Sequence, residues 1–112
     1  MNKKTIEKVV NFSKVRDWEQ YHTGKDLAVS LSLEASELLE VYQWSGKDEW
    51  VKEKTDKIKE ELADILMYSI LIADAYNLDL DEIVLEKLKD NERKYPVNLA
   101  KGKKEKYNEL KK

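Results

Sequence analysis

The sequence has no cysteine, one histidine, one proline and three glycines among its 112 residues. The absence of cysteine excludes disulfides, thiolate zinc sites and cysteine nucleophiles, and a single histidine excludes multi-histidine metal centres within one chain. Average usage of ~7% glycine and ~5% proline would give roughly eight and six residues. This shortage argues against a β-sandwich or barrel, which needs many tight turns, and against a glycine-rich phosphate loop.

Long apolar segments are missing as well. The longest run without a charged residue, 65–73, has nine residues, whereas a membrane helix needs ~20 apolar residues. The N-terminal segment MNKKTIEKVV lacks the apolar stretch of a signal peptide. We therefore expect a soluble, cytoplasmic protein with no membrane partner.

The net charge of −2 is unevenly distributed along the chain. The last twelve residues hold six Lys and two Glu, a net charge of +4, so residues 1–100, with 15 basic and 21 acidic residues, carry −6. An acidic body with a short basic tail is not the pattern of a duplex-DNA-binding protein, and we expect no nucleic-acid partner. The length predicts one domain over 1–112, in which 96–112 forms a polar, basic tail.

Helical spacing of apolar residues predicts four helices, and no strand signal is long enough to compete. Thr23 and Asp79 each precede an acid by three residues, the spacing of a capping box, and Pro96 ends the last helix because the residue before a proline disfavours helix. The predicted helices span 5–21, 25–44, 54–76 and the residues from 79 to Pro96, with a charged connection or short helix at 47–53. The fold class is all-α, a four-helix bundle.

The third predicted helix is apolar on all sides from 65 to 73. Such a helix is normally buried all round, and three other short helices offer little cover. We expect a second copy of the chain to cover it, most simply by two-fold pairing, and Ile70, on the side opposite Glu61, is predicted to need that partner. The alternative is a monomer with this helix at its centre.

Two acids occupy core-facing positions on the predicted helices. At 100° per residue, Glu34 lies in the middle of the apolar stripe of the second helix, and Glu61 lies in the middle of the stripe of the third. Glu37 and Asp64 each follow three residues later, 60° to the same side. Because the chain has 23 acids, the spacing alone arises easily by chance, and the core-facing position is the informative feature.

A buried carboxylate has to be paired, protonated or bound to a metal. Lys54 and Lys57 precede Glu61 on its face, so a salt bridge is one explanation, but no base lies on the apolar face of the second helix. Four inward-facing carboxylates predict a site for a hard cation, Mg²⁺ or Mn²⁺. A ferritin-like di-iron centre is the rival, but it needs two Glu-x-x-His motifs, and this chain has one, Glu19 to His22.

Two further groups of residues point to a nucleotide. Aromatic side chains near the helix breaks can stack on a base, although packing is the simpler explanation for any one of them. A basic stretch near the end of the fourth helix can bind phosphate, although cations also favour a helix C-terminus. The aromatic residues are Trp18, Tyr21, Tyr42, Trp44 and Trp50, with Tyr68 one turn after Asp64, and the basic stretch holds Lys87, Asn91, Arg93, Lys94 and Tyr95.

The segments 33–38 (LEASEL) and 60–64 (EELAD) resemble the paired acid motifs of the MazG-like all-α nucleoside triphosphate pyrophosphohydrolases. Residues 87–96 (KLKDNERKYP) resemble the later motif of that family. Residues 16–22 (RDWEQYH) and 42–44 (YQW) are most similar to those of the members that act on dCTP. The resemblance covers about residues 12–110, nearly the whole chain.

The resemblance implies a helical bundle that forms a homodimer or a homotetramer built as a dimer of dimers. It implies Mg²⁺ bound by four acids and cleavage of a nucleoside triphosphate to the monophosphate and pyrophosphate. By motif match, the metal ligands and catalytic residues are Glu34, Glu37, Glu61 and Asp64, the residues facing the base or sugar are His22, Trp18, Trp44 and Tyr68, and those facing the phosphates are Lys87, Asn91 and Tyr95.

Three functions remain open from the sequence. The first is hydrolysis of dCTP or a related deoxynucleotide in cleansing of the nucleotide pool. The second is the same reaction with a preference for dUTP or for NTPs broadly. The third is a helical interaction protein whose acids are structural, or bind metal without turnover.

Overall fold

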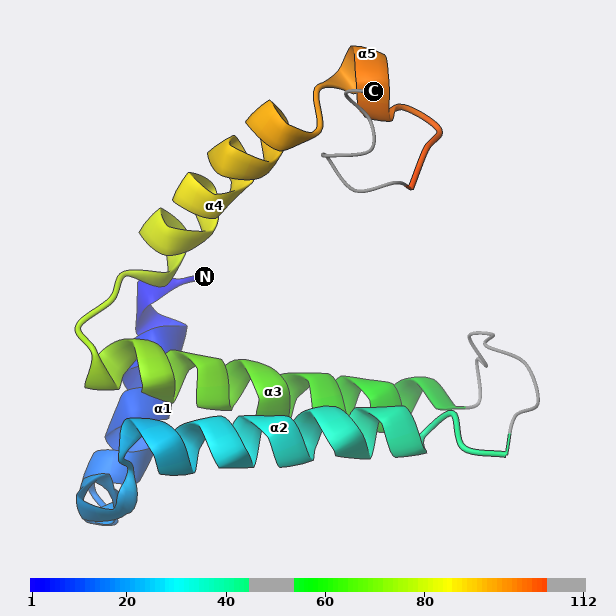
Figure 1. Ribbon diagram of the computed structural model, residues 1–112. Helices are drawn as coiled ribbons and strands as arrows, with labels where there is room; N and C mark the ends of the chain where they lie inside the picture. Colours follow the sequence, from blue (N-terminus) through cyan, green and yellow to red (C-terminus); the bar gives the residue numbers. More distant parts are fainter. Residues whose placement is uncertain (45–53, 105–112) are drawn as a thin grey trace. The chain divides into compact units, whose positions relative to one another are not determined.

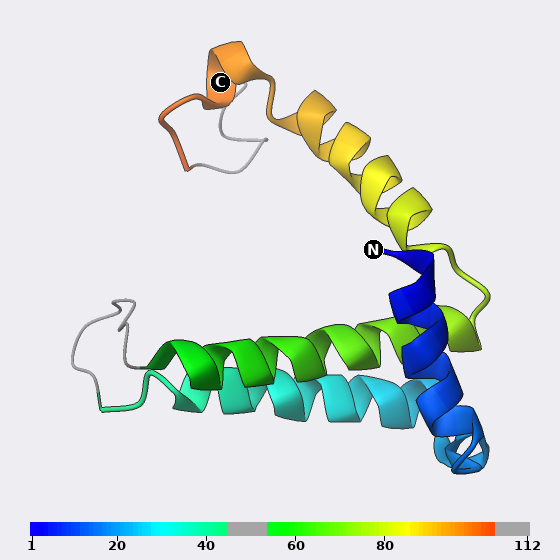
Figure 2. The same ribbon diagram turned by 180° about the vertical axis from the view of Figure 1, so that it is seen from behind.

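The computed structural model describes residues 1–44 and 54–104, and these residues form helices joined by short turns (Figures 1 and 2). The elements are α1 (Lys3–Lys14), the 3-10 turn η1 (Trp18–Tyr21), α2 (Gly24–Glu40), α3 (Thr55–Ala75), α4 (Leu80–Lys94) and α5 (Val97–Ala100). No strand occurs in this part of the chain, which confirms the all-α prediction. The predicted connection at 47–53 lies outside the described residues.

The helix starts follow from side-chain caps. The Lys4 backbone N–H donates to Asn2 Oδ1 at 2.7 Å, the Asp26 N–H donates to Thr23 Oγ1 at 3.2 Å, and the Glu82 N–H donates to Asp79 Oδ1 at 3.0 Å. Each bond satisfies a backbone donor that has no partner within the first helical turn. The caps expected at Thr23 and Asp79 are therefore confirmed.

Two helices are shorter than the periodicity predicts. The first ends at Lys14 rather than at Tyr21, because Asp17 adopts a left-handed conformation with φ of 58° and redirects the chain into η1. The second ends at Glu40, and the turn that follows it reaches Trp44, which has φ of 69°. Asn77, with φ of 54°, follows α3 as expected of a helix stop. Pro96 ends α4 and also begins α5 within the segment predicted as a tail.

The chain divides into two compact units, Met1–Leu78 and Asp79–Lys112. In the first unit, α2 and α3 run antiparallel and side by side, and α1 crosses α3 (Figures 1 and 2). The Lys54 ammonium donates to the Val41 carbonyl at 2.6 Å and ties the end of α2 to the start of α3. The buried apolar side chains of this unit are Val10, Leu27, Ile70 and Ala73. The hairpin of α2 and α3, crossed by α1, thus forms the framework of the site.

The apolar side chains of α3 are buried within the single chain to a different extent than predicted. Ile70 is only 2% exposed within the single chain, so the prediction that Ile70 needs a partner from a second copy is wrong. The uncovered apolar side chains of α3 are Leu62, Leu66 and Met67, which are 47%, 43% and 46% exposed. An oligomer remains a prediction.

The second unit carries α4 and α5. Val84 and Leu88, one turn apart on α4, are 60% and 49% exposed, so α4 also presents an apolar stripe. In the described part of the chain, no helix combines the length and the hydropathy needed to cross a membrane.

Candidate active site

Two acids from α2 and two from α3 meet where the helices run side by side (Figure 1). Glu34, Glu37, Glu61 and Asp64 each offer a carboxylate oxygen, and these four atoms lie within 4.8 Å of one another. Glu61 is 3% exposed, Glu34 and Asp64 are half-buried, and Glu37 is exposed at the edge of the cluster. The pairing of α2 with α3 therefore brings together the four acids that the sequence singles out.

Among the described residues, the ammonium of Lys57 lies against this cluster. The Lys57 ammonium is 3.0 Å from Glu61 Oε1 and 3.5 Å from Glu60 Oε2. Its hydrogen bond lowers the pKa of Glu61, and the same bond raises the pKa of Lys57. The salt bridge expected as one explanation for Glu61 is present, but a single ammonium cannot neutralise four carboxylates.

The crowding of negative charge raises the pKa of Glu37. Hydrogen bonds with Glu34 and then with Glu61, together with their negative charges, raise the pKa of Glu37 to about 7. Closely spaced carboxylates cannot all ionise at low cost, so one of them retains its proton. The cluster without a cation is therefore electrostatically strained near neutral pH.

The donor set fits a hard divalent cation. Glu34 Oε2 and Glu61 Oε2 are buried and make no hydrogen bond within the described residues, and a buried carboxylate oxygen without a partner is costly. Mg²⁺ and Mn²⁺ prefer carboxylate oxygens as ligands. A cation held by these oxygens would satisfy both unpartnered atoms and neutralise the repulsion at Glu37.

A cavity of about 430 Å³ adjoins the carboxylates within the first unit. Glu34 and Asp64 belong both to its wall and to the acidic cluster, so the cavity opens directly onto the carboxylates. The remaining lining residues are Lys8, Val9, Phe12, Ser13, Trp18, His22, Met67, Tyr68 and Leu71. A mostly apolar cavity ending in carboxylates suits a ligand with an aromatic part and a charged part.

The cavity contains three of the four residues predicted to face a base or sugar. Trp18, His22 and Tyr68 line it, and the Trp18 ring meets the Phe12 ring edge to face, with centroids 5.6 Å apart. Trp44 does not line it and is 92% exposed after the end of α2. The structure thus groups the first three and leaves Trp44 apart from them in this chain.

The wall of this cavity also includes residues of α1, which the sequence motifs do not predict. Lys8, Val9, Phe12 and Ser13 line it, and their spacing places them on one face of the helix. This spacing is the feature of the sequence from which their common position could be predicted. It was not sufficient, because the candidate site is defined by acids on the two following helices and α1 contributes none of these acids. The Arg16 guanidinium lies 3.7 Å from the centroid of the Phe12 ring and covers it from outside the cavity wall.

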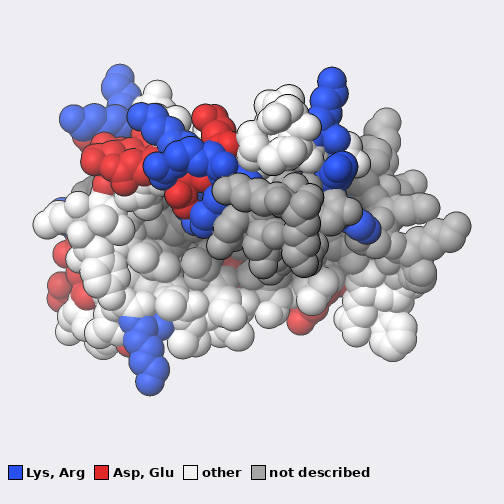
Figure 3. Space-filling model, turned by 45° about the horizontal axis from the view of Figure 1, so that its top comes forward, with Lys and Arg blue, Asp and Glu red and all other residues white. Residues whose placement is uncertain are grey.

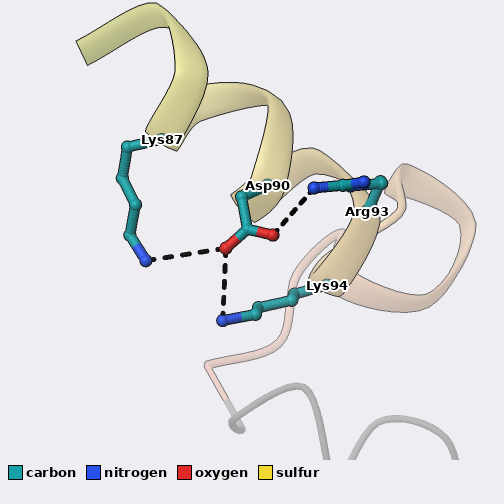
Figure 4. A network of polar contacts seen from close by, with 4 residues as sticks. All are labelled: Lys87, Asp90, Arg93 and Lys94. Carbon is teal, nitrogen blue, oxygen red and sulfur yellow. Dashed lines mark hydrogen bonds and ion pairs between the residues drawn. The ribbon is translucent and has the colours of Figure 1, made fainter. Parts of the chain in front are cut away.

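The residues expected to face the phosphates lie on or just after α4, in the second unit. Figure 4 shows that Asp90 binds three cations: Arg93 at 2.9 Å, Lys94 at 3.4 Å and Lys87 at 3.6 Å. These contacts, that of Lys94 first, lower the pKa of Asp90. Asn91 is exposed on the next position of the helix. One acidic side chain thus holds three basic side chains together on a single helix face, where positive charge is in excess.

On the face drawn in Figure 3, Lys and Arg side chains lie next to Asp and Glu side chains. The described residues form no continuous basic patch on that face.

Comparison with known proteins identifies the family. A model of the MazG-like family matches residues 29–110. The chain belongs to the MazG-like family. The resemblance based on the two acid motifs is therefore confirmed, and both motifs lie within the matched range.

Three similar proteins carry informative names. dCTP pyrophosphatase 1 of Bos taurus and dCTP pyrophosphatase 1 of Homo sapiens are each 38% identical to this MazG-like chain over 88% of its length, covering 62% and 61% of the respective relative. The chain thus spans about three fifths of the length of these curated relatives. A crystal structure of a pyrophosphatase from Archaeoglobus fulgidus superimposes with a TM-score of 0.69 at 35% identity, over 83% of this chain and 90% of that one.

Proposed function

We propose that this MazG-like protein is a Mg²⁺-dependent nucleoside triphosphate pyrophosphohydrolase, acting on dCTP or a related (d)NTP in cleansing of the nucleotide pool. The observation that carries the proposal is the cluster of four carboxylates within 4.8 Å that opens into the adjoining cavity. The names of the relatives support pyrophosphate release and dCTP as the first substrate to test. The protein would work as a homo-oligomer in the cytoplasm.

The shared residues Glu34 and Asp64 support an orientation for the substrate. A base that occupies the cavity beside Trp18, His22 and Tyr68 directs its sugar and α-phosphate toward the carboxylates. Glu34, Glu37, Glu61 and Asp64 would hold Mg²⁺, with Mn²⁺ as a substitute, and the ion would supply charge neutralisation and Lewis acidity at the phosphates.

The reaction displaces pyrophosphate from the α-phosphorus. A water oxygen forms a bond to the α-phosphorus, the bond from that phosphorus to the bridging oxygen breaks, and the bridging oxygen leaves with pyrophosphate. Glu37 or Glu40, which line the same groove on the outer side of the cluster, accepts the proton of the attacking water. Lys87, Asn91 and Tyr95 are proposed to bind the leaving phosphates.

The deciding experiment measures pyrophosphate release from a panel of dCTP, dUTP and the four NTPs, with Mg²⁺ and with a chelator. We expect release from dCTP only with the metal. Hydrolysis in ¹⁸O-labelled water should place the label in dCMP. Label in the pyrophosphate would mean attack at the β-phosphorus, and release of inorganic phosphate with dCDP would mean attack at the terminal bond. Metal binding without hydrolysis of any nucleotide would favour the non-catalytic alternative.

A further inference from the structure

Ser13 on α1 is a buried polar residue that the proposed metal site does not explain. The buried polar side chains among the described residues are Ser13, 2% exposed, and Glu61, 3% exposed. Glu61 belongs to the carboxylate cluster. Ser13 lies on a different helix and lines the cavity beside the cluster. A polar group at that depth needs a hydrogen-bonding partner.

Other serines in the helices of this chain satisfy their hydroxyls locally. Ser36 Oγ donates to the Ser32 carbonyl at 3.1 Å, and Ser69 Oγ donates to the Ile65 carbonyl at 2.9 Å. In the described part of the chain, no such local bond involves the Ser13 hydroxyl, and Ser13 instead forms part of the cavity wall. A hydroxyl offers one donor and two acceptor positions, so a ligand in the cavity can satisfy it.

The surroundings of Ser13 indicate the chemical class of that ligand. Phe12 and Trp18 form an edge-to-face aromatic pair, and Met67 and Leu71 add further apolar wall. A planar group with a polar edge fits such a wall, since its faces contact apolar side chains while its edge makes a hydrogen bond. The carboxylates that adjoin the cavity would face the charged part of the same ligand.

We propose that Ser13 is a specificity-determining residue whose hydroxyl hydrogen-bonds the polar edge of the substrate's nucleobase. This inference rests on the proposed function, because that function places a nucleotide in the cavity. The hydroxyl selects for a base with a donor or acceptor at that edge, because an apolar edge would leave the buried hydroxyl without a partner.

The test compares Ser13→Ala with Ser69→Ala, a control that also removes a helical hydroxyl that is not fully exposed. Calorimetry with Mg²⁺ measures the affinity for the α,β-imido analogue of dCTP, whose bridging bond resists hydrolysis, and for the same sugar triphosphate without the base. We expect Ser13→Ala to weaken binding of the analogue about tenfold, to leave binding of the base-free probe unchanged, and to keep the melting temperature. Ser69→Ala should leave both affinities at the wild-type value.

Several results would overturn the inference. One is an unchanged affinity of Ser13→Ala for the analogue, and another is an equal loss of affinity for both probes. A third is a loss of affinity in Ser13→Ala together with a lower melting temperature, where Ser13→Cys keeps the wild-type melting temperature. A wild-type protein that does not bind the analogue would also overturn it. A wild-type protein that binds the analogue and loses affinity in Ser13→Ala, yet hydrolyses no nucleotide, would refute the proposed function and leave this inference standing.

Discussion

The carboxylate cluster of the first unit has an excess of negative charge, and the basic cluster of α4 has an excess of positive charge. Four acids meet beside one ammonium, that of Lys57, whereas three cations surround one acid, Asp90. In the first cluster, two buried oxygens lack partners within the described part of the chain. In the second, the charges lie at the surface of a single helix and are screened by water. The first arrangement can therefore be relieved by a bound cation or by a proton on Glu37, and the second can exist without a ligand.

The largest expected effect comes from neutralising one acid of the cluster. Glu34→Gln or Glu61→Gln should abolish turnover, because the proposed metal loses a ligand. Stability in the presence of a chelator should hold steady or rise, because the repulsion among the remaining acids falls. Steady-state assays and thermal melts of the same variants test this, with Glu60→Gln as the control, since Glu60 also contacts Lys57 but is exposed. Near-wild-type activity in either variant would remove that residue from the metal site.

The two sides of α3 offer the next contrast. Ile70→Asp places a charge where the side chain is 2% exposed, which should cost several kcal/mol and unfold the chain. Leu66→Asp, at a position 43% exposed, should leave the chain folded and dissociate the oligomer. Circular dichroism and sedimentation together separate the outcomes. A monomeric wild type would refute the oligomer, and a folded Ile70→Asp would contradict the burial of Ile70.

A smaller effect is expected from the proposed base-binding residues. His22→Ala should weaken substrate binding by about 5- to 150-fold, the equivalent of one stacking contact of ~1–3 kcal/mol, without changing metal affinity. Trp44→Ala should do the same if its exposed ring meets the substrate, and its melting temperature should stay near that of the wild type. A loss of thermal stability with unchanged affinity would assign either residue to packing.

The four-acid cluster could be predicted from the sequence because it depends on helical periodicity, which places Glu34 and Glu61 in apolar stripes. The pairing of α2 with α3 then follows from the need to bury both stripes. The end of the first helix at Lys14 could not be predicted in this way, since the left-handed Asp17 interrupts a sequence that still reads as helical. The burial of Ile70 also depends on tertiary packing around α3, and periodicity within one helix does not contain that information.

The residues that line the cavity could also be predicted only in part from the sequence. His22 and Trp18 lie in a motif that resembles a family and Tyr68 lies one turn after another such motif, whereas Ser13 and the other wall residues on α1 lie outside and before these motifs. Their common feature is a crossing of helices in space, which depends on tertiary packing rather than on local spacing.

The smallest expected effects are pH dependences of opposite sign in the two clusters. The pKa of Glu37 in the folded chain, about 7, lies above its ordinary value of 4.5. Its contribution to stability is therefore complete below pH 4.5 and is lost as the pH rises through 7. Melts in a chelator should show falling stability between pH 5.5 and 8, less so in Glu37→Gln, with Glu40→Gln as the control. An identical slope in Glu37→Gln and the wild type would contradict the account.

Asp90 should behave in the reverse direction. Its cations lower its pKa below the ordinary 3.8, so its contribution is present above that value and is lost as the pH falls through the lower pKa. Asp90→Asn should make the helicity of α4 less sensitive to pH between 4 and 2, as measured by circular dichroism. Equal acid sensitivity in Asp90→Asn and the wild type would show that the three contacts do not stabilise the helix.

The central claim is that the four carboxylates form a metal site, and calorimetric titration of Mg²⁺ and Mn²⁺ into the nucleotide-free protein tests it most directly. We predict saturable binding to the wild type and to Glu60→Gln, and loss of binding in Glu61→Gln. Equal binding to all three proteins, or no binding to the wild type, would contradict the account.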